Sequence, residues 1–182
     1  MLRNTKQRFT TLLISTLWLT SVTPAHAFPS PEKSEEEQIQ EIRKDATKSY
    51  NKGVEKQKKA FEHFEKGDTS KATKELEKAV EEYEKAITQN DSFPEALSNM
   101  GYCLRNLGNY TKALEAYDRA LKLNPNFPEA IEYRAVAYLW LGRKDEAKSE
   151  YERLLKMDST EAAELKRAID AAEAGKLTKG KW

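Results

Sequence analysis

Few side chains in this sequence of 182 residues have the chemistry that active sites use. Cys103 is the only cysteine, and His63 is the only histidine apart from His26 near the start of the chain. A thiolate can act as a nucleophile and an imidazole as a general base, but neither residue lies in a CxxC, CxxCH or HExxH motif. Acidic runs such as Glu35–Glu37 are interspersed with lysine, which is typical of a solvated helix face. The sequence therefore predicts a non-enzymatic protein with no cofactor and no metal site.

The two isolated candidates have simpler interpretations. His63 is flanked by Lys and Glu residues, which favours a solvated histidine. Cys103 falls beside the apolar stripe of its segment, so we expect a small buried side chain rather than a reactive thiol. Because there is only one cysteine, an internal disulfide bond is excluded. Aromatic and arginine side chains remain, and these types dominate protein-binding surfaces.

Helices are the elements that must position these side chains. Apolar residues recur three or four apart along the chain, and no segment alternates with period two, so we expect an all-α protein without strands. A long charged helix from Glu35 should end at Gly67-Asp68, and a second helix should end at Asp91. Shorter helices are expected over 95–107, 111–123, 129–141, 145–157 and 160–174. Gly108 and Gly142 follow the last apolar residue of two of these helices, where a left-handed residue ends a helix at low cost.

An internal repeat organises the second half of the chain. The tetrapeptide FPEA occurs at 93–96 and at 127–130, an offset of 34 residues, and it places proline at the start of a helix. This part of the sequence resembles the tetratricopeptide repeat family, whose pattern is W-x2-L-G-x2-Y, A-x3-F and P on a 34-residue period. The first repeat matches it with Leu97, Gly101, Leu104, Ala113, Tyr117 and Pro125, and the second with Ile131, Ala135, Tyr138, Ala147 and Tyr151. The second repeat departs from the pattern at Arg134, a normally apolar position, and at Ser159 in place of proline.

The resemblance implies a tetratricopeptide-type α-solenoid of helix-turn-helix repeats. We expect repeats at 93–127 and 128–159, a capping helix at 160–174 and a basic tail at 175–182. A longer helical hairpin at 35–92 precedes them and has two interpretations. It is either an extended repeat, because Gly53 and Gly67 are fourteen residues apart where Gly101 and Gly108 are seven apart, or an unrelated hairpin that caps the array.

The first 27 residues have the succession of a secretory signal peptide. Three basic residues precede an uncharged apolar run, and Ala25-His26-Ala27 forms a small-x-small cleavage pattern. We expect an exported, periplasmic or comparably luminal protein that is cleaved after Ala27, with a linker at 28–34. The alternative is an uncleaved membrane anchor, although the apolar run is shorter than the roughly 20 residues a spanning helix needs.

Cleavage after Ala27 would remove only positive charge. It leaves 28 basic and 30 acidic residues, a net charge of −2 with both signs interspersed. This balance argues against nucleic-acid binding, because no basic patch is formed. No later apolar run is long enough to span a bilayer, so we expect no membrane span in the mature chain.

In the tetratricopeptide family the first helix of each repeat lines a concave groove that holds peptides or partner proteins. The positions that the resemblance assigns to this groove here are Ser98, Asn99, Tyr102, Arg105, Asn106, Glu132, Tyr133, Val136 and Trp140. For Trp140 the alternative is packing against the capping helix. Glu129 and Glu132 would repel an acidic terminus, so we expect a partner segment of mixed apolar and polar character. The alternative function is a homo-oligomer that pairs through the long N-terminal helix, where Ile39 and Ile42 begin an apolar stripe.

Overall fold

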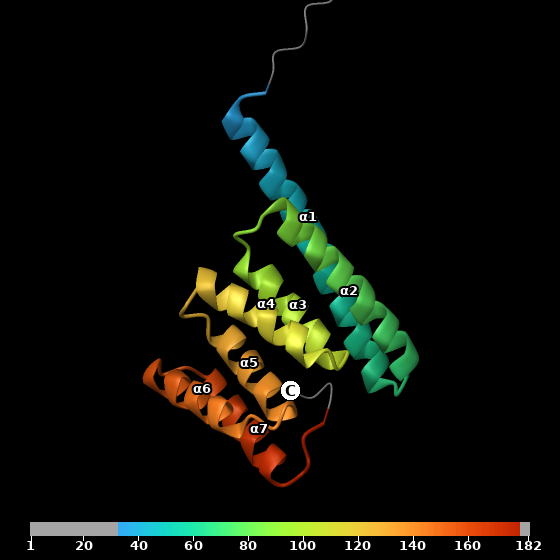
Figure 1. The fold of residues 1–182 in the computed structure, drawn as a ribbon. Helices are drawn as coiled ribbons and strands as arrows, with labels where there is room; N and C mark the ends of the chain where they lie inside the picture. Colours follow the sequence, from blue (N-terminus) through green and yellow to red (C-terminus); the bar gives the residue numbers. More distant parts are fainter. Residues whose placement is uncertain (1–32, 179–182) are drawn as a thin grey trace, which may run out of the picture. The chain divides into compact units, whose positions relative to one another are not determined.

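Seven α-helices follow one another between residues 33 and 178, the part of the chain that the computed structural model describes, and this part contains no strand (Figure 1). The predicted all-α fold is confirmed. The five later helices begin and end within one residue of the predicted bounds. In chain order the helices are α1 Glu35–Glu65, α2 Thr69–Gln89, α3 Pro94–Asn106, α4 Tyr110–Leu123, α5 Pro128–Trp140, α6 Lys144–Lys156 and α7 Glu161–Glu173.

Local sequence explains where the helices begin and end. Ser34 starts α1 with a capping box, because its hydroxyl accepts from the Glu37 amide at 3.2 Å and the Glu37 carboxylate accepts from the Ser34 amide at 3.1 Å. Gly108 and Gly142 have φ of 86° and 74°, the left-handed conformation expected just after α3 and α5. The repeats at 93–127 and 128–159 therefore turn between their two helices at the glycines that the sequence predicted.

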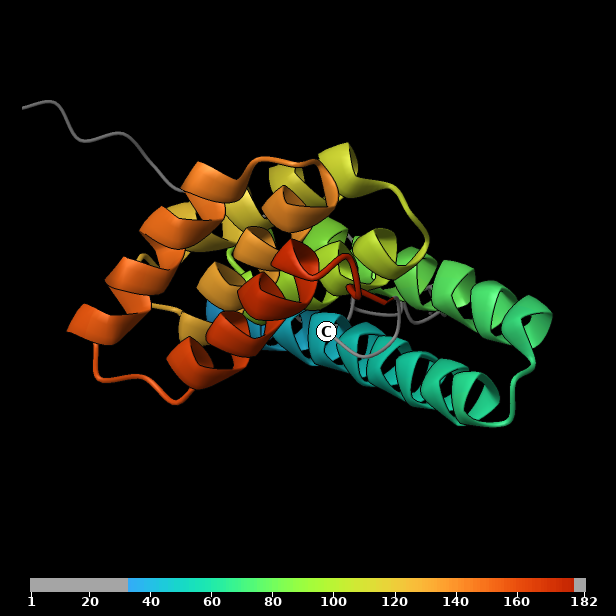
Figure 2. The same ribbon diagram turned by 90° about the horizontal axis from the view of Figure 1, so that it is seen from below.

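The helices form two layers. Each helix packs against the next one in the chain, so α1 pairs with α2, α3 with α4 and α5 with α6. The odd-numbered helices α1, α3, α5 and α7 also contact one another in that order and make an inner layer, while α2, α4 and α6 lie outside it (Figures 1 and 2). Because short loops make neighbouring helices antiparallel, α3, α5 and α7 run in the same direction.

Small residues let the helices of a hairpin approach closely. A Cβ atom on Gly101 would lie 2.6 Å from Cε1 of Tyr117, whose ring is fully buried. Gly53 has the same relation to the buried Tyr83, again at 2.6 Å. The longer hairpin thus repeats the glycine–tyrosine contact of the next repeat, which favours interpreting it as an extended repeat.

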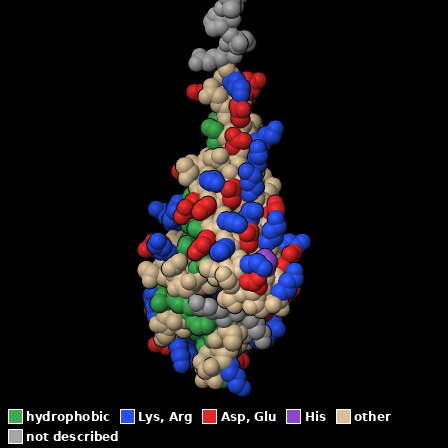
Figure 3. Space-filling view, turned by 90° about the vertical axis from the view of Figure 1, so that its right-hand side faces the viewer, with side chains coloured by type: hydrophobic (Ala, Val, Ile, Leu, Met, Phe, Trp, Pro, Cys, Tyr) green, Lys and Arg blue, Asp and Glu red, His purple; other side chains and the backbone are tan. Residues whose placement is uncertain are grey.

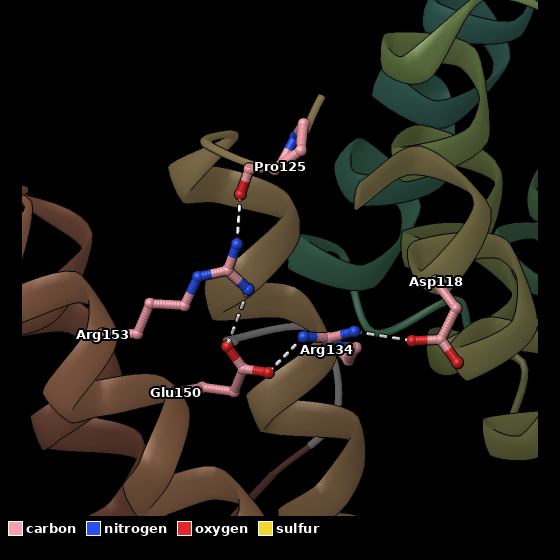
Figure 4. A network of polar contacts seen from close by, with 5 residues as sticks. All are labelled: Asp118, Pro125, Arg134, Glu150 and Arg153. Carbon is pink, nitrogen blue, oxygen red and sulfur yellow. Dashed lines mark hydrogen bonds and ion pairs between the residues drawn. The ribbon is translucent and has the colours of Figure 1, made fainter. Parts of the chain in front are cut away.

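A polar network joins the second repeat to the first (Figure 4). Arg134 of α5 pairs with Asp118 of α4 at 2.6 Å and with Glu150 of α6. Arg153 lies 3.5 Å from the other oxygen of Glu150 and donates to the carbonyl oxygen of Pro125. Arg134, which departs from the family pattern, therefore connects α5 to α4 and α6 through ion pairs.

The outer face of the α1–α2 hairpin is charged. Lys, Arg, Asp and Glu side chains are interspersed over it (Figure 3), and pairs such as Lys59–Glu55 and Lys85–Glu82 bridge neighbouring turns at 2.6 Å. Surface ion pairs of this kind each contribute little to the stability of the fold, so their main effect is to keep this face hydrated.

Several sequence-based expectations fall on residues that the structure does not describe. The expected signal peptide at 1–27, most of the linker at 28–34 and the end of the basic tail at 175–182 lie outside the described residues. Within residues 33–178 no helix combines the length and the apolar character that crossing a membrane requires.

Candidate peptide-binding face

Aromatic rings from three inner helices lie side by side. We call Phe64 and Phe61 of α1, Tyr102 of α3 and Tyr133 of α5 the aromatic strip. Successive ring centroids are 6.1, 5.6 and 4.8 Å apart, and the rings are tilted, which is a favourable arrangement for aromatic pairs. All four side chains are partly exposed. The strip therefore offers a continuous apolar surface across three helices.

The guanidinium of Arg105 lies over two rings of this strip. Its central carbon is 4.8 Å from the centroid of Tyr102 and 5.9 Å from that of Tyr133, within the range of cation–π interactions. The residue is only 2% exposed. Arg105 was predicted as an exposed binding residue, and its burial corrects that expectation. It packs against both rings, so its truncation should also lower stability.

Glu132 is the buried carboxylate of this face. It is 8% exposed, and burial raises its pKa to about 7 although the positive charge of Arg105 acts in the opposite direction. The nearby carboxylates of Glu129 and Glu161 raise it further. Glu132 makes no hydrogen bond or ion pair with any other residue between 33 and 178. A carboxyl group with a pKa near neutrality beside a partly exposed surface is a candidate ligand contact.

The predicted groove residues divide into two groups. Asn99, Tyr102, Tyr133 and Trp140 are partly exposed, as a binding surface requires. The others are buried, and for these the expected exposure is wrong: Ser98, Arg105, Asn106, Glu132 and Val136. The predicted groove residues are offset by one residue from the apolar core stripe of their helices. Because consecutive inner helices pack against each other, these positions lie largely inside that contact.

Two of the partly exposed residues already have partners. The amide nitrogen of Asn99 donates to the hydroxyl of Tyr50 in α1 at 3.1 Å. Trp140 stacks on Tyr110 at the start of α4, with centroids 5.6 Å apart and planes 7° from parallel. This contact was not among the expectations for Trp140. The surface available to a partner is therefore centred on Tyr102 and Tyr133.

Sequence reasoning missed the contribution of α1. Phe61 and Phe64 continue the apolar stripe that begins at Ile39 and Ile42, and neither is among the groove residues predicted from the sequence. Gln57, a gap in that stripe, accepts from the hydroxyl of Tyr83 at 2.7 Å and from the thiol of Cys103 at 3.7 Å. Applying the extended-repeat interpretation to α1 would have placed Phe61 on the same face as Tyr102.

The part of the chain that the structure describes shows no arrangement for metal or thiol chemistry. Cys103 is fully buried, as expected, and burial raises the pKa of its thiol well above the usual range. Its thiol therefore stays protonated. Among residues 33–178 no group of histidine, cysteine and acidic side chains is placed to hold a metal ion.

A stack of helical hairpins of this kind defines a helical repeat protein. Models of the tetratricopeptide repeat match residues 63–93, 94–127 and 129–159, which together are 96 of the 182 residues. The chain belongs to the tetratricopeptide repeat family. The match at 63–93 covers α2 and the end of α1, so the long hairpin contains a repeat too.

Solved structures of this type confirm the fold class, an all-α tetratricopeptide-type solenoid. The tetratricopeptide repeat (TPR) domain of OM64 from Arabidopsis is 18% identical, with a TM-score of 0.56, and the match covers 71% of this chain and 97% of that one. The first TPR domain of human RPAP3 is 24% identical, with a TM-score of 0.52 and coverage of 69% and 94%. The first TPR of Spaghetti (RPAP3), bound to the HSP90 peptide SRMEEVD, is 24% identical, with a TM-score of 0.51 and coverage of 69% and 95%. No curated protein matches the sequence.

Proposed function

We propose that the chain is an exported, non-enzymatic scaffold that binds a segment of a partner protein along its inner face. The observation that carries this proposal is the aromatic strip, because it presents partly exposed rings from three helices in one line. Tyrosine is a frequent centre of binding energy in protein interfaces, and a rigid ring loses little entropy on binding. The family to which the chain belongs typically serves protein–protein interaction.

The charges of the face favour a partner segment that is not acidic. The first TPR of Spaghetti (RPAP3) is bound to an HSP90 peptide that ends in EEVD. Here Glu129, Glu132 and Glu161 gather near the beginning of α5 and α7, so a run of carboxylates would be repelled at that end. Apolar and aromatic side chains fit the strip, and a lysine or arginine of the partner would pair with Glu132. We therefore expect a segment of mixed apolar and basic character.

Affinity capture from an envelope extract, followed by titration, tests this function. Tyr102→Ala should weaken binding of the captured partner by about 2 kcal/mol, or about thirtyfold, while thermal unfolding changes little. Tyr138→Ala is the matched control, because Tyr138 also carries an arginine, Arg143, 4.5 Å above its ring but is not part of the strip. If Tyr102→Ala binds the partner as tightly as Tyr138→Ala does, with both variants folded, the strip is not part of the binding surface.

Export rests on the sequence of residues 1–27 alone, through its basic start, apolar run and Ala25-His26-Ala27. The compartment we propose is the periplasm or a comparable lumen.

Self-association is a second candidate, and the start of α1 favours it. Ser49 of α1 bonds to Gln89, the last residue of α2, at 3.1 Å, so the part of α1 before this point extends past α2. Ile39 and Ile42 in that part are 47% and 50% exposed. Light scattering separates the candidates: a monomer that still binds its partner supports the scaffold, and a dimer abolished by Ile42→Glu supports pairing through α1.

A further inference from the structure

The chain turns back onto the repeats after α7. Gly175 adopts a φ of 67°, and the amide of Lys176 donates to the carbonyl of Ala171 at 2.7 Å, which closes the end of the helix. Leu177 is then partly buried against the hydrophobic core. The segment after α7, red in Figures 1 and 2, heads toward the side where α1 and α2 lie.

This path leads to the aromatic strip. Since α3, α5 and α7 run in the same direction, the end of α7 lies at the same end of the layer as Arg105 and Trp140. Four residues follow Thr178, and fully extended they span at most about 14 Å. Packed helices are about 8–10 Å apart, so a segment that has already turned back from α7 can pass α5 and arrive at α3.

The chemistry of the segment is complementary to this surface. Lys176, Lys179 and Lys181 make it basic, and Trp182 adds an aromatic ring. The ends of three parallel helices present their negative dipole ends, which attract lysine.

Beside the strip, the carboxylate of Glu132, which acts electrostatically on Tyr102 and Tyr133, can accept from an ammonium group. The rings of Tyr102 and Tyr133, with the guanidinium of Arg105 over them, offer an indole both ring–ring and cation–π contacts.

We propose that residues 179–182 of the same chain dock on the aromatic strip, with Trp182 beside Tyr102 and Tyr133, and occupy the surface that a partner must use. This inference rests on the proposed function, because it concerns the same face. Docking in cis would make the chain its own competitor. A tethered segment acts at an effective concentration on the order of mM, so weak contacts suffice to keep it bound.

Fluorine NMR of the full chain labelled with 5-fluorotryptophan tests the docking. The resonance of Trp182 is identified by its loss in Trp182→Phe. A soluble gadolinium chelate should relax it several-fold less than it relaxes the synthetic peptide GKLTKGKW, which corresponds to residues 175–182. Tyr102→Ala should raise the relaxation to the level of the peptide, and the control Tyr138→Ala should leave it low. Relaxation as strong as in the free peptide, or protection that Tyr102→Ala leaves unchanged, would overturn the proposal.

Two further measurements establish whether docking is in cis. Protection of Trp182 should not change on dilution, and loss on dilution would show docking on a second copy instead. A chain truncated after Thr178 should bind GKLTKGKW much more tightly than the full chain does, and equal binding would overturn the proposal. If the segment proves accessible while Tyr102→Ala still weakens the captured partner, the docking alone fails and the scaffold function stands.

Discussion

Replacing Glu132 with glutamine should stabilise the protein at alkaline pH. The carboxyl group is 8% exposed, and its pKa is raised from 4.5 to about 7, with burial as the largest cause. The folded protein therefore binds this proton more tightly than the unfolded chain does. The stability that the protonated group supports is fully present below about pH 4.5 and is lost as pH rises to about 7.

The magnitude follows from the shift. A pKa difference of one unit corresponds to about 1.4 kcal/mol, so the change from 4.5 to about 7 sets an upper bound of about 3 kcal/mol on the free energy lost above pH 7. Glutamine has nearly the same shape and carries no charge. We expect Glu132→Gln to raise the free energy of unfolding by about 1–3 kcal/mol at pH 8 and to leave it nearly unchanged at pH 4.5.

Urea unfolding of both proteins at the two pH values is the assay, followed by circular dichroism. Other groups titrate over this range, but they cancel in the difference between wild type and variant. Glu152→Gln on the exposed surface of α6 is the control, and it should change stability by less than about 0.5 kcal/mol at either pH. A Glu132→Gln protein that is less stable than wild type at pH 8 would refute the reasoning, because it would mean that Arg105 more than offsets the cost of burial.

Three further predictions follow from the packing and from the sequence. Gly101→Ala should destabilise by about 1–3 kcal/mol in urea, because its Cβ would lie 2.6 Å from Cε1 of the buried Tyr117; an unchanged midpoint would show that the ring can move. Ala120→Leu, at a fully buried position, should lower the urea midpoint more than Lys122→Leu, at an exposed one; equal shifts would contradict the helix register. Mass spectrometry of the exported protein should find Phe28 as its first residue, whereas intact Met1, or a protein confined to the cytosol, would contradict export with cleavage after Ala27.

Sequence periodicity was sufficient for the helices and for the repeat. Gly101, Ala113 and Tyr117 recur with the spacing that close helix packing demands, and the structure buries all three. Helix ends followed from glycine and proline, whose backbone preferences act locally. These features depend on neighbours three or four residues away, so a single sequence contains the information.

Exposure on the inner face was harder to predict because it depends on contacts between repeats. Ser98, Arg105 and Glu132 lie one step around from the core stripe, where a lone helix would expose them. Each of their helices packs against the next inner helix, and only 1%, 2% and 8% of these residues is exposed. The closeness of that helix depends on side chains about 34 residues further along, which a pattern within one helix does not contain.

Two charged residues of α5, Arg134 and Glu132, differ in whether their charge is compensated within the fold. Arg134 is paired on two sides, by Asp118 and by Glu150, so its charge is compensated within the fold (Figure 4). Glu132 is more deeply buried but has no ion pair with another residue between 33 and 178, and its pKa is raised to about 7. The compensated charge of Arg134 helps to fix the packing of α4, α5 and α6 and needs no partner from outside the fold. A carboxyl group without such a pair, beside partly exposed rings, would gain stability from an approaching cation. We therefore expect Glu132 to favour both a basic partner segment and the proposed docking of residues 179–182.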